Sequence, residues 1–158
     1  MSPYLHSLEV GDKLSFSGPY GDFFLQQNSD KAVVCVAGGV GLAPMKSIIN
    51  HMLDNGIKRE IYLFYGARDL SLLYDHDRFE LLAGKHPNFH YYPTLLDDDS
   101  AKDWKVDKGF VTTVFNDKFS VGVEAEAYVC GPPVMVDVLM PLLRNKGINE
   151  NDIYYDKF

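Results

Sequence analysis

The chain is poor in the residues that mark several large classes of protein. Its two cysteines, Cys35 and Cys130, lie far apart and form no CxxC pair, which excludes a disulfide-stapled fold and a zinc finger. A reducing compartment is the simplest explanation, so we expect a cytoplasmic protein. Its 5 histidines form no HExxH motif and no pair at ligand spacing, so we expect no bound metal.

Positive charge is scarce as well. The 158 residues include 15 Lys and Arg against 22 Asp and Glu, a net charge of −7, and no basic stripe. This balance argues against nucleic acid or an anionic membrane surface as a partner. We also find no apolar run long enough to span a bilayer and no charged-then-apolar leader, so we expect no direct membrane insertion. The remaining composition, 46% hydrophobic and 23% charged, is typical of one globular domain.

Apolar segments alternate with amphipathic ones along most of the chain. Five apolar segments predict strands, at residues 32–37, 61–65, 89–95, 127–130 and 153–156. Four segments with helical spacing predict helices, at residues 45–53, 74–83, 110–115 and 134–143. Short connections between alternating strands and helices favour an α/β fold: a doubly wound, parallel, five-stranded sheet with helices on both faces.

Two segments do not fit this simple alternation. Pro141 falls inside the last predicted helix and removes a backbone donor, so we expect a kink or an early end there. Residues 11–18 alternate apolar and polar between two glycines, which predicts a half-buried strand of an antiparallel sheet. A boundary near Gln27 separates this segment from the α/β body.

A glycine-rich turn follows the first predicted strand of the α/β body, with the sequence GGVGLAP at residues 38–44. Glycine lets the backbone approach a phosphate closely, and the helix that follows offers free N–H groups and a positive dipole end. The turn lacks the third glycine of the GxGxxG fingerprint, because Pro44 stands in its place, and it is not a Walker A loop. A phosphate site and a merely tight turn both remain open.

Two further strand ends carry polar groups. Cys130 and Gly131 end the fourth strand, where a thiol beside a glycine can touch a flat ligand ring, although a buried structural cysteine fits equally. Asp97 and Asp98 follow the third strand. There a carboxylate can accept a hydrogen bond from an adenosine ribose hydroxyl, or can simply belong to a solvated acidic loop.

Taken in order, these motifs resemble the nicotinamide-binding domain of the ferredoxin–NADP reductase superfamily over nearly the whole chain. The motifs are GPYG at 18–21, GGVGLAP at 38–44, YGAR at 65–68, Leu73-Tyr74, and CGPP at 130–133 with Met135. The YGAR segment, Trp104 and the ending YDKF look most like NADH-dependent multicomponent oxygenase reductases. These include phenol and methane monooxygenase reductases and the flavin subunit of sodium-translocating NADH:quinone reductase.

The resemblance implies a role for each matching residue. The glycine turn would face the pyrophosphate through Gly38, Gly39, Gly41 and Pro44. Arg68 and Tyr74 would lie near the adenosine half. The catalytic position would be Cys130, beside the nicotinamide where hydride leaves, and its neighbours in the motif would be Gly131, Pro132 and Met135. Phe158 would cover a flavin ring.

One family motif is absent from this chain. Flavin domains of this superfamily carry an Arg-x-Tyr-Ser/Thr motif, which the sequence does not contain. We therefore expect residues 1–27 to be the C-terminal remnant of an FAD-binding barrel and residues 28–158 to be the NAD(H)-binding domain. The chain is then either a natural half-enzyme or an excised domain, and we favour the excised domain. Two cysteines cannot hold a 2Fe-2S cluster, so any such centre belongs to another domain or partner.

The sequence thus favours the NADH-binding domain of a flavin-dependent electron-transfer reductase. In the intact enzyme, hydride would pass from NADH to FAD and electrons on to an iron–sulfur centre. The expected partners are a flavin-binding domain and a ferredoxin-like domain or protein, and the fragment alone is expected to be inactive. The alternatives are a non-catalytic nucleotide-binding subunit that docks onto a larger electron-transfer complex, and a structural module with a vestigial glycine turn.

Overall fold

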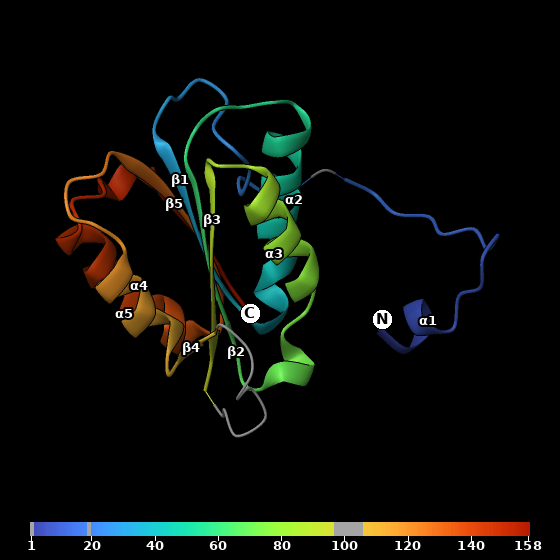
Figure 1. Cartoon of the computed structure of the whole chain (residues 1–158). Coiled ribbons are helices and arrows are strands. Elements are labelled where there is room, and N and C mark those ends of the chain that lie inside the picture. Colours follow the sequence, from blue (N-terminus) through green and yellow to red (C-terminus); the bar gives the residue numbers. More distant parts are fainter. Residues whose placement is uncertain (1, 19, 97–105) are drawn as a thin grey trace.

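The computed structural model describes residues 2–18, 20–96 and 106–158. Within these residues six strands form one parallel sheet in the order β4-β3-β2-β1-β5-β6 (Figure 1). The strands are β1 Ala32–Gly38, β2 Ile61–Ala67, β3 Phe89–Leu95, β4 Asp107–Lys108, β5 Ala125–Gly131 and β6 Ile153–Lys157. The predicted doubly wound parallel sheet is confirmed, with the two-residue β4 as a sixth strand in addition to the five predicted.

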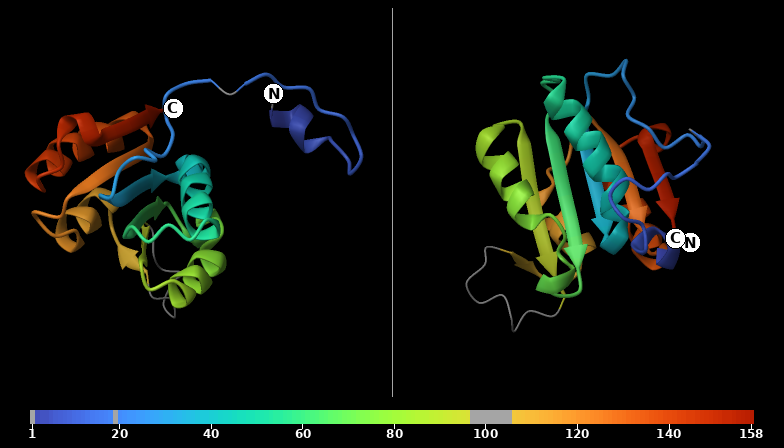
Figure 2. Two further views of the ribbon diagram at one scale, coloured as in Figure 1. Left: turned by 90° about the horizontal axis from the view of Figure 1, so that it is seen from above. Right: turned by 90° about the vertical axis from the view of Figure 1, so that its right-hand side faces the viewer.

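Four helices cover the two faces of the sheet: α2 Leu42–Asp54, α3 His76–Lys85, α4 Val111–Lys118 and α5 Pro133–Asn145. A fifth helix, α1 Ser2–His6, lies apart from the sheet in Figures 1 and 2. Helices α2 and α3 lie on one face, and α4 and α5 lie on the other, as Figures 1 and 2 show. Among the residues that the structure describes, no helix is long and apolar enough to cross a membrane.

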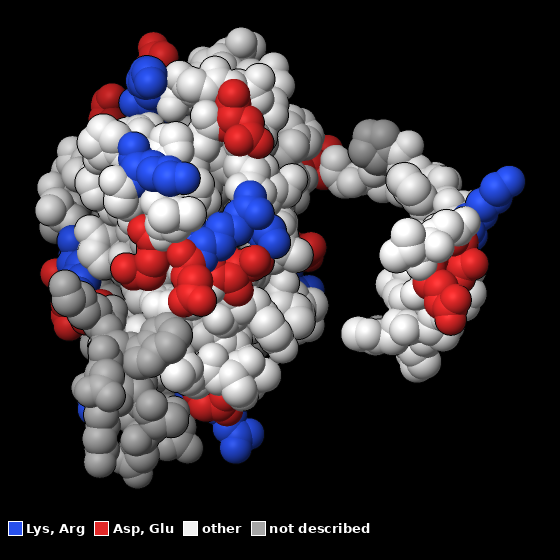
Figure 3. Space-filling view, turned by 45° about the vertical axis from the view of Figure 1, so that its right-hand side comes forward, with Lys and Arg blue, Asp and Glu red and all other residues white. Residues whose placement is uncertain are grey.

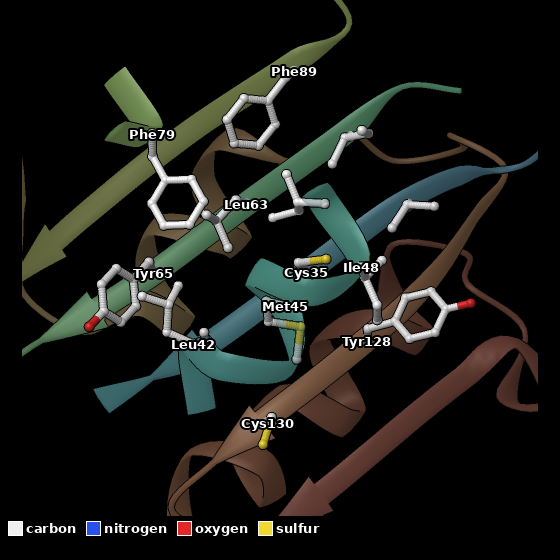
Figure 4. Close-up of a cluster of buried hydrophobic side chains, with 14 of the residues drawn as sticks. Cys35, Leu42, Met45, Ile48, Leu63, Tyr65, Phe79, Phe89, Tyr128 and Cys130 are labelled. Atoms are coloured by element: carbon white, nitrogen blue, oxygen red, sulfur yellow. The ribbon is translucent and has the colours of Figure 1, made fainter. Parts of the chain in front are cut away.

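The hydrophobic core has two layers, one on each side of the sheet. Every residue from Val33 to Ala37 of β1 is 0% exposed, because both faces of this central strand are covered. Cys35 belongs to the layer beneath α2 and α3 that Figure 4 shows. Val34 and Val36 belong to the layer beneath α4 and α5. This double burial explains why β1 is a continuous apolar run in the sequence.

Polar contacts join α2 to α3 at the surface. The Lys46 ammonium lies 2.7 Å from the Asp75 carboxylate, and Arg78 donates a hydrogen bond to the Asn50 side chain at 3.0 Å. Acidic and basic side chains adjoin one another on this side of the molecule, which is turned forward in Figure 3. These contacts hold the two helices together as one layer over the sheet.

The prediction of a strand in the residues before the sheet is wrong. Residues 11–18 form no strand, and none of the described strands pairs with them. Leu14 and Phe16 are 47% and 89% exposed, and the stretch extends away from the α/β body in Figures 1 and 2. The alternating pattern is that of a strand, but a strand needs a neighbour for its backbone groups, and the parallel sheet supplies none here.

A second correction concerns Pro141. Helix α5 continues past this residue to Asn145, so the predicted early end is wrong. Pro141 lies on the exposed side of the helix, while Leu139 and Leu143 are buried against the sheet. The backbone carbonyl that would accept a hydrogen bond from an N–H at position 141 can therefore face solvent. Burial of the opposite side of the helix compensates for this missing hydrogen bond.

Candidate nucleotide-binding site

A cavity of about 700 Å³ lies at the carboxyl edge of the sheet. Its walls are formed by the ends of β1 and β2, the residue after β3, and the first turns of α4 and α5. The walls are almost entirely apolar, and Arg68 is the charged residue among the described ones that line it. Open α/β sheets bind ligands at this edge, and a cavity of this volume suits a small molecule.

The predicted glycine turn forms part of this cavity. Strand β1 ends at Gly38, a 3-10 turn spans Gly39–Gly41, and α2 begins at Leu42. Gly38 and Gly39 line the cavity, and Gly39 has a φ of +55°, a conformation that side chains disfavour. The backbone at this turn is therefore open to close approach by a ligand beside the amino end of a thirteen-residue helix.

Gly41 has a different role from its two neighbours. A Cβ atom at this position would lie 2.1 Å from the Cys130 carbonyl oxygen, far inside van der Waals contact. Gly41 is buried, and it lets the start of α2 pack directly against the end of β5. Pro44 is the third residue of α2, half-buried and outside the cavity wall. Neither residue lines the cavity: Gly41 permits the close packing behind the turn, and Pro44 lies in the first turn of α2.

The motif after β5 contributes the opposite wall. Pro132 and Met135, at the start of α5, both line the cavity. A Cβ atom on Gly131 would lie 2.6 Å from the Met135 Cε, and one on Gly38 would lie 2.8 Å from the Met135 Sδ. The absence of side chains at these two glycines therefore lets the Met135 side chain lie across the ends of β1 and β5.

Arg68 and Tyr74 form the side of the cavity beyond β2. Arg68 directly follows the strand and is exposed, while Tyr74 precedes α3 and is 48% exposed. Both line the cavity, as the resemblance implies. A guanidinium and a phenol ring at one end of an apolar cavity provide a cation for phosphate oxygens and a flat surface for a base.

Cys130 lies beside the cavity rather than in its wall. It ends β5 with only 4% of its surface exposed and packs in the layer beneath α2, as Figure 4 shows. Burial raises the pKa of the Cys130 thiol, and the nearby Asp156 carboxylate raises it further. The thiol is therefore protonated at neutral pH, which suits packing against a ring and does not suit nucleophilic attack.

The remaining predicted residues lie elsewhere. Phe158 follows β6, is 56% exposed, and does not line the cavity. Asp97 and Asp98 lie outside the described residues. Their proposed contact with a ribose therefore stays a prediction.

The structure adds an aromatic side chain that sequence reasoning missed. Phe110 is 66% exposed and lines the cavity just before α4, where the sequence indicated only a short helix. Gly66 lies under the same helix, and a Cβ atom there would be 2.9 Å from the Val111 Cβ. The signal in the sequence was a phenylalanine directly after Gly109, at the start of the predicted helix. Its position opposite β2 depends on the tertiary fold.

The parallel sheet, the glycine turn at the start of α2 and the cavity at the carboxyl edge together define a dinucleotide-binding domain. Residues 35–140 match the family model described as the oxidoreductase NAD-binding domain. The chain belongs to this family, which forms the nicotinamide-binding part of the ferredoxin–NADP reductase superfamily. The resemblance stated from the sequence is confirmed.

Similar proteins agree with this assignment. The chain is 40% identical over 157 residues to the phenol hydroxylase P5 protein of Acinetobacter pittii, covering 98% of the chain and 44% of that protein. It is 34% identical over 163 residues to a subunit of the Na(+)-translocating NADH-quinone reductase of Idiomarina loihiensis, covering 100% of the chain and 40% of that protein. The cytochrome b5 reductase domain of Ulva prolifera nitrate reductase superposes with a TM-score of 0.84 at 26% identity, covering 98% of the chain and 64% of that domain. The chain thus spans less than half the length of the phenol hydroxylase and quinone reductase relatives.

Proposed function

We propose that this domain binds NADH in the cavity at the carboxyl edge and presents it to a flavin in a larger electron-transfer reductase. The observation that carries this proposal is the cavity of about 700 Å³ against the Gly38–Gly39 turn and the amino end of α2. A pyrophosphate at this turn gains backbone donors and the positive end of the helix dipole. Arg68 adds a cation on the far side of the cavity.

The lining of the cavity also supports one orientation of the nucleotide. The adenosine half would lie between Tyr74 and Phe110, two exposed rings in the cavity wall beyond β2. The nicotinamide half would extend over Gly131 toward the Cys130 thiol at the end of β5. Bound NADH would supply a hydride at this point, and FAD and an iron–sulfur centre of the larger enzyme would supply the acceptors for its electrons. This chain's residues would hold the donor in place, and the exposed Phe158 would cover the flavin ring that another domain supplies.

The flavin would come from another domain. Residues 1–27 are proposed to be the end of an FAD-binding barrel, and residues 28–158 the NAD(H)-binding domain. In support, Phe16 and Phe24 are 89% and 56% exposed, which leaves apolar surface for a neighbouring domain to cover. A ferredoxin-like domain or protein, with a 2Fe-2S centre, would be the next partner. The buried, unpaired Cys35 and Cys130 suit a reducing compartment, so we place the protein in the cytoplasm.

Calorimetric titration with NADH, NADPH and FAD tests the proposal. NADH should bind, and Arg68→Ala should weaken binding about tenfold because it removes a charge-assisted contact to phosphate. Arg78→Ala is the matched control, since this exposed arginine of α3 lies outside the cavity wall. Absence of NADH binding, or equal loss in both variants, contradicts the proposal.

The same titration tests the choice of nucleotide and the missing flavin site. NADPH should bind more weakly than NADH, because the segment after the third strand offers Asp97 and Asp98 rather than cations to a 2′-phosphate. FAD should not be retained by this chain. A purified sample with near-stoichiometric flavin absorbance would disprove the assignment of flavin binding to another domain.

A further inference from the structure

Tyr65 joins the hydrophobic core to the wall of the cavity. It belongs to β2, is 0% exposed, and packs in the layer beneath α2 and α3. Figure 4 shows its hydroxyl at the end of that layer toward which β2 runs. Burial raises the pKa of the Tyr65 hydroxyl, so the group keeps its proton at neutral pH and can donate a hydrogen bond.

The Tyr65 hydroxyl makes two hydrogen bonds to one short segment of backbone. It donates to the Leu72 carbonyl oxygen at 3.1 Å and accepts from the Tyr74 N–H at 3.4 Å. Leu72 and Tyr74 both line the cavity. One buried hydroxyl thus contacts the backbone of two wall residues. It satisfies the carbonyl of Leu72, at the end of the 3-10 helix Leu70–Leu72, and the amide of Tyr74, which lies outside helices and strands.

Other contacts fix the two ends of this segment. At its start, Asp69 accepts hydrogen bonds from the Ser71 N–H at 3.0 Å and the Ser71 hydroxyl at 2.6 Å. At its end, Asp75 has a φ of +56° and forms the 2.7 Å ion pair with Lys46. A positive φ at a residue other than glycine is strained and persists only where surrounding contacts hold it. The contacts of Tyr65 lie between these two ends.

We propose that Tyr65 is a positioning residue for nucleotide binding, acting through the backbone of Leu72 and Tyr74. This inference rests on the proposed function, because it assumes that the cavity takes the nucleotide. A wall segment that is ordered before binding does not lose conformational freedom when the ligand arrives. Without the hydroxyl, the segment must be ordered by the ligand, and affinity falls although no residue that touches the ligand has changed.

Tyr65→Phe is the direct test, since it removes the hydroxyl and keeps the buried ring. We expect NADH to bind about tenfold more weakly by calorimetry, as two backbone groups lose their partner. Tyr128→Phe is the matched control: Tyr128 is also 0% exposed, packs in the same layer, and makes two hydrogen bonds through its hydroxyl. Figure 4 shows that this hydroxyl points to the opposite end of the layer.

Amide hydrogen exchange provides a second readout that a loss of general stability does not mimic. Exchange at residues 72–74 should speed up in Tyr65→Phe and stay unchanged in Tyr128→Phe. Each variant is measured at the same number of degrees below its own melting temperature. Equal NADH affinity in wild type and Tyr65→Phe overturns the inference and leaves the proposed function intact. Equal affinity loss in both variants, or unchanged exchange at 72–74, also overturns it. If the wild-type chain binds no NADH, the proposed function fails and this inference fails with it.

Discussion

Arg59 and Glu126 form a buried ion pair at the edge of the sheet opposite the cavity. The Arg59 guanidinium lies 2.7 Å from the Glu126 carboxylate, with side chains 8% and 3% exposed. Arg59 also donates hydrogen bonds to the carbonyl oxygens of Gln26 and Lys31, and Tyr128 donates to Glu126. This network fixes the chain that enters β1 against the starts of β2 and β5.

Removal of Arg59 should therefore be costly. Arg59→Ala leaves the Glu126 carboxylate buried without its cation, so we expect a loss of about 3–5 kcal/mol in the free energy of unfolding. Urea unfolding measures this change. Arg144→Ala is the matched control, because Arg144 pairs with Glu150 at the surface with side chains 49% and 70% exposed. That variant should lose less than about 1 kcal/mol, and similar losses in the two variants would contradict the burial argument.

The packing of α2 against β5 depends on the absence of a side chain at Gly41. Because an added Cβ would meet the Cys130 carbonyl oxygen at 2.1 Å, Gly41→Ala must displace backbone on one side or the other. We expect a loss of about 3 kcal/mol in the free energy of unfolding. Gly56→Ala is the control that introduces backbone strain without a steric clash, since Gly56 has a φ of +64° and open space around it. It should lose about 1 kcal/mol in the free energy of unfolding. A smaller loss at Gly41 than at Gly56 would show that the close contact is not needed.

The sequence predicts features that depend on neighbours along the chain. The apolar run of β1, the helical spacing of α2 and the glycine turn between them are all local, and each is found where expected. The contacts of the Tyr65 hydroxyl and the Arg59–Glu126 pair are not local: Arg59 and Glu126 lie 67 residues apart. Residues 11–18 show a case in which a local pattern gives a wrong prediction. Their alternation is typical of a strand, but a strand forms only where a partner strand is present.

Burial of the Cys35 thiol predicts a dependence of stability on alkaline pH. Burial raises the pKa of this thiol from 9.0 to about 12. Above pH 9 the unfolded chain releases the proton while the folded chain keeps it, so stability is complete below about pH 9 and falls as pH rises toward 12. Over that window the stability difference between wild type and Cys35→Ala should shrink by up to about 1.4 kcal/mol per pH unit in urea unfolding. Ile49→Val, a core change without a titrating group, should show a difference that does not vary with pH.

Cys130 should act on the rate of hydride transfer rather than on nucleotide affinity. The thiol is protonated, 4% exposed and at the end of β5, so its proposed role is to pack against the nicotinamide and hold the reacting carbon in place. Errors of position near 1 Å can slow a reaction on the order of a hundredfold. In the intact reductase, Cys130→Ala should therefore slow flavin reduction by NADH strongly in stopped-flow measurements and leave NADH affinity nearly unchanged. Cys130→Ser, which is nearly isosteric, should be milder. Cys35→Ala is the control for loss of a buried thiol, since Cys35 is 0% exposed in the middle of β1. If Cys130→Ala melts at a lower temperature but reduces flavin at the wild-type rate, Cys130 is a core residue and has no part in the reaction.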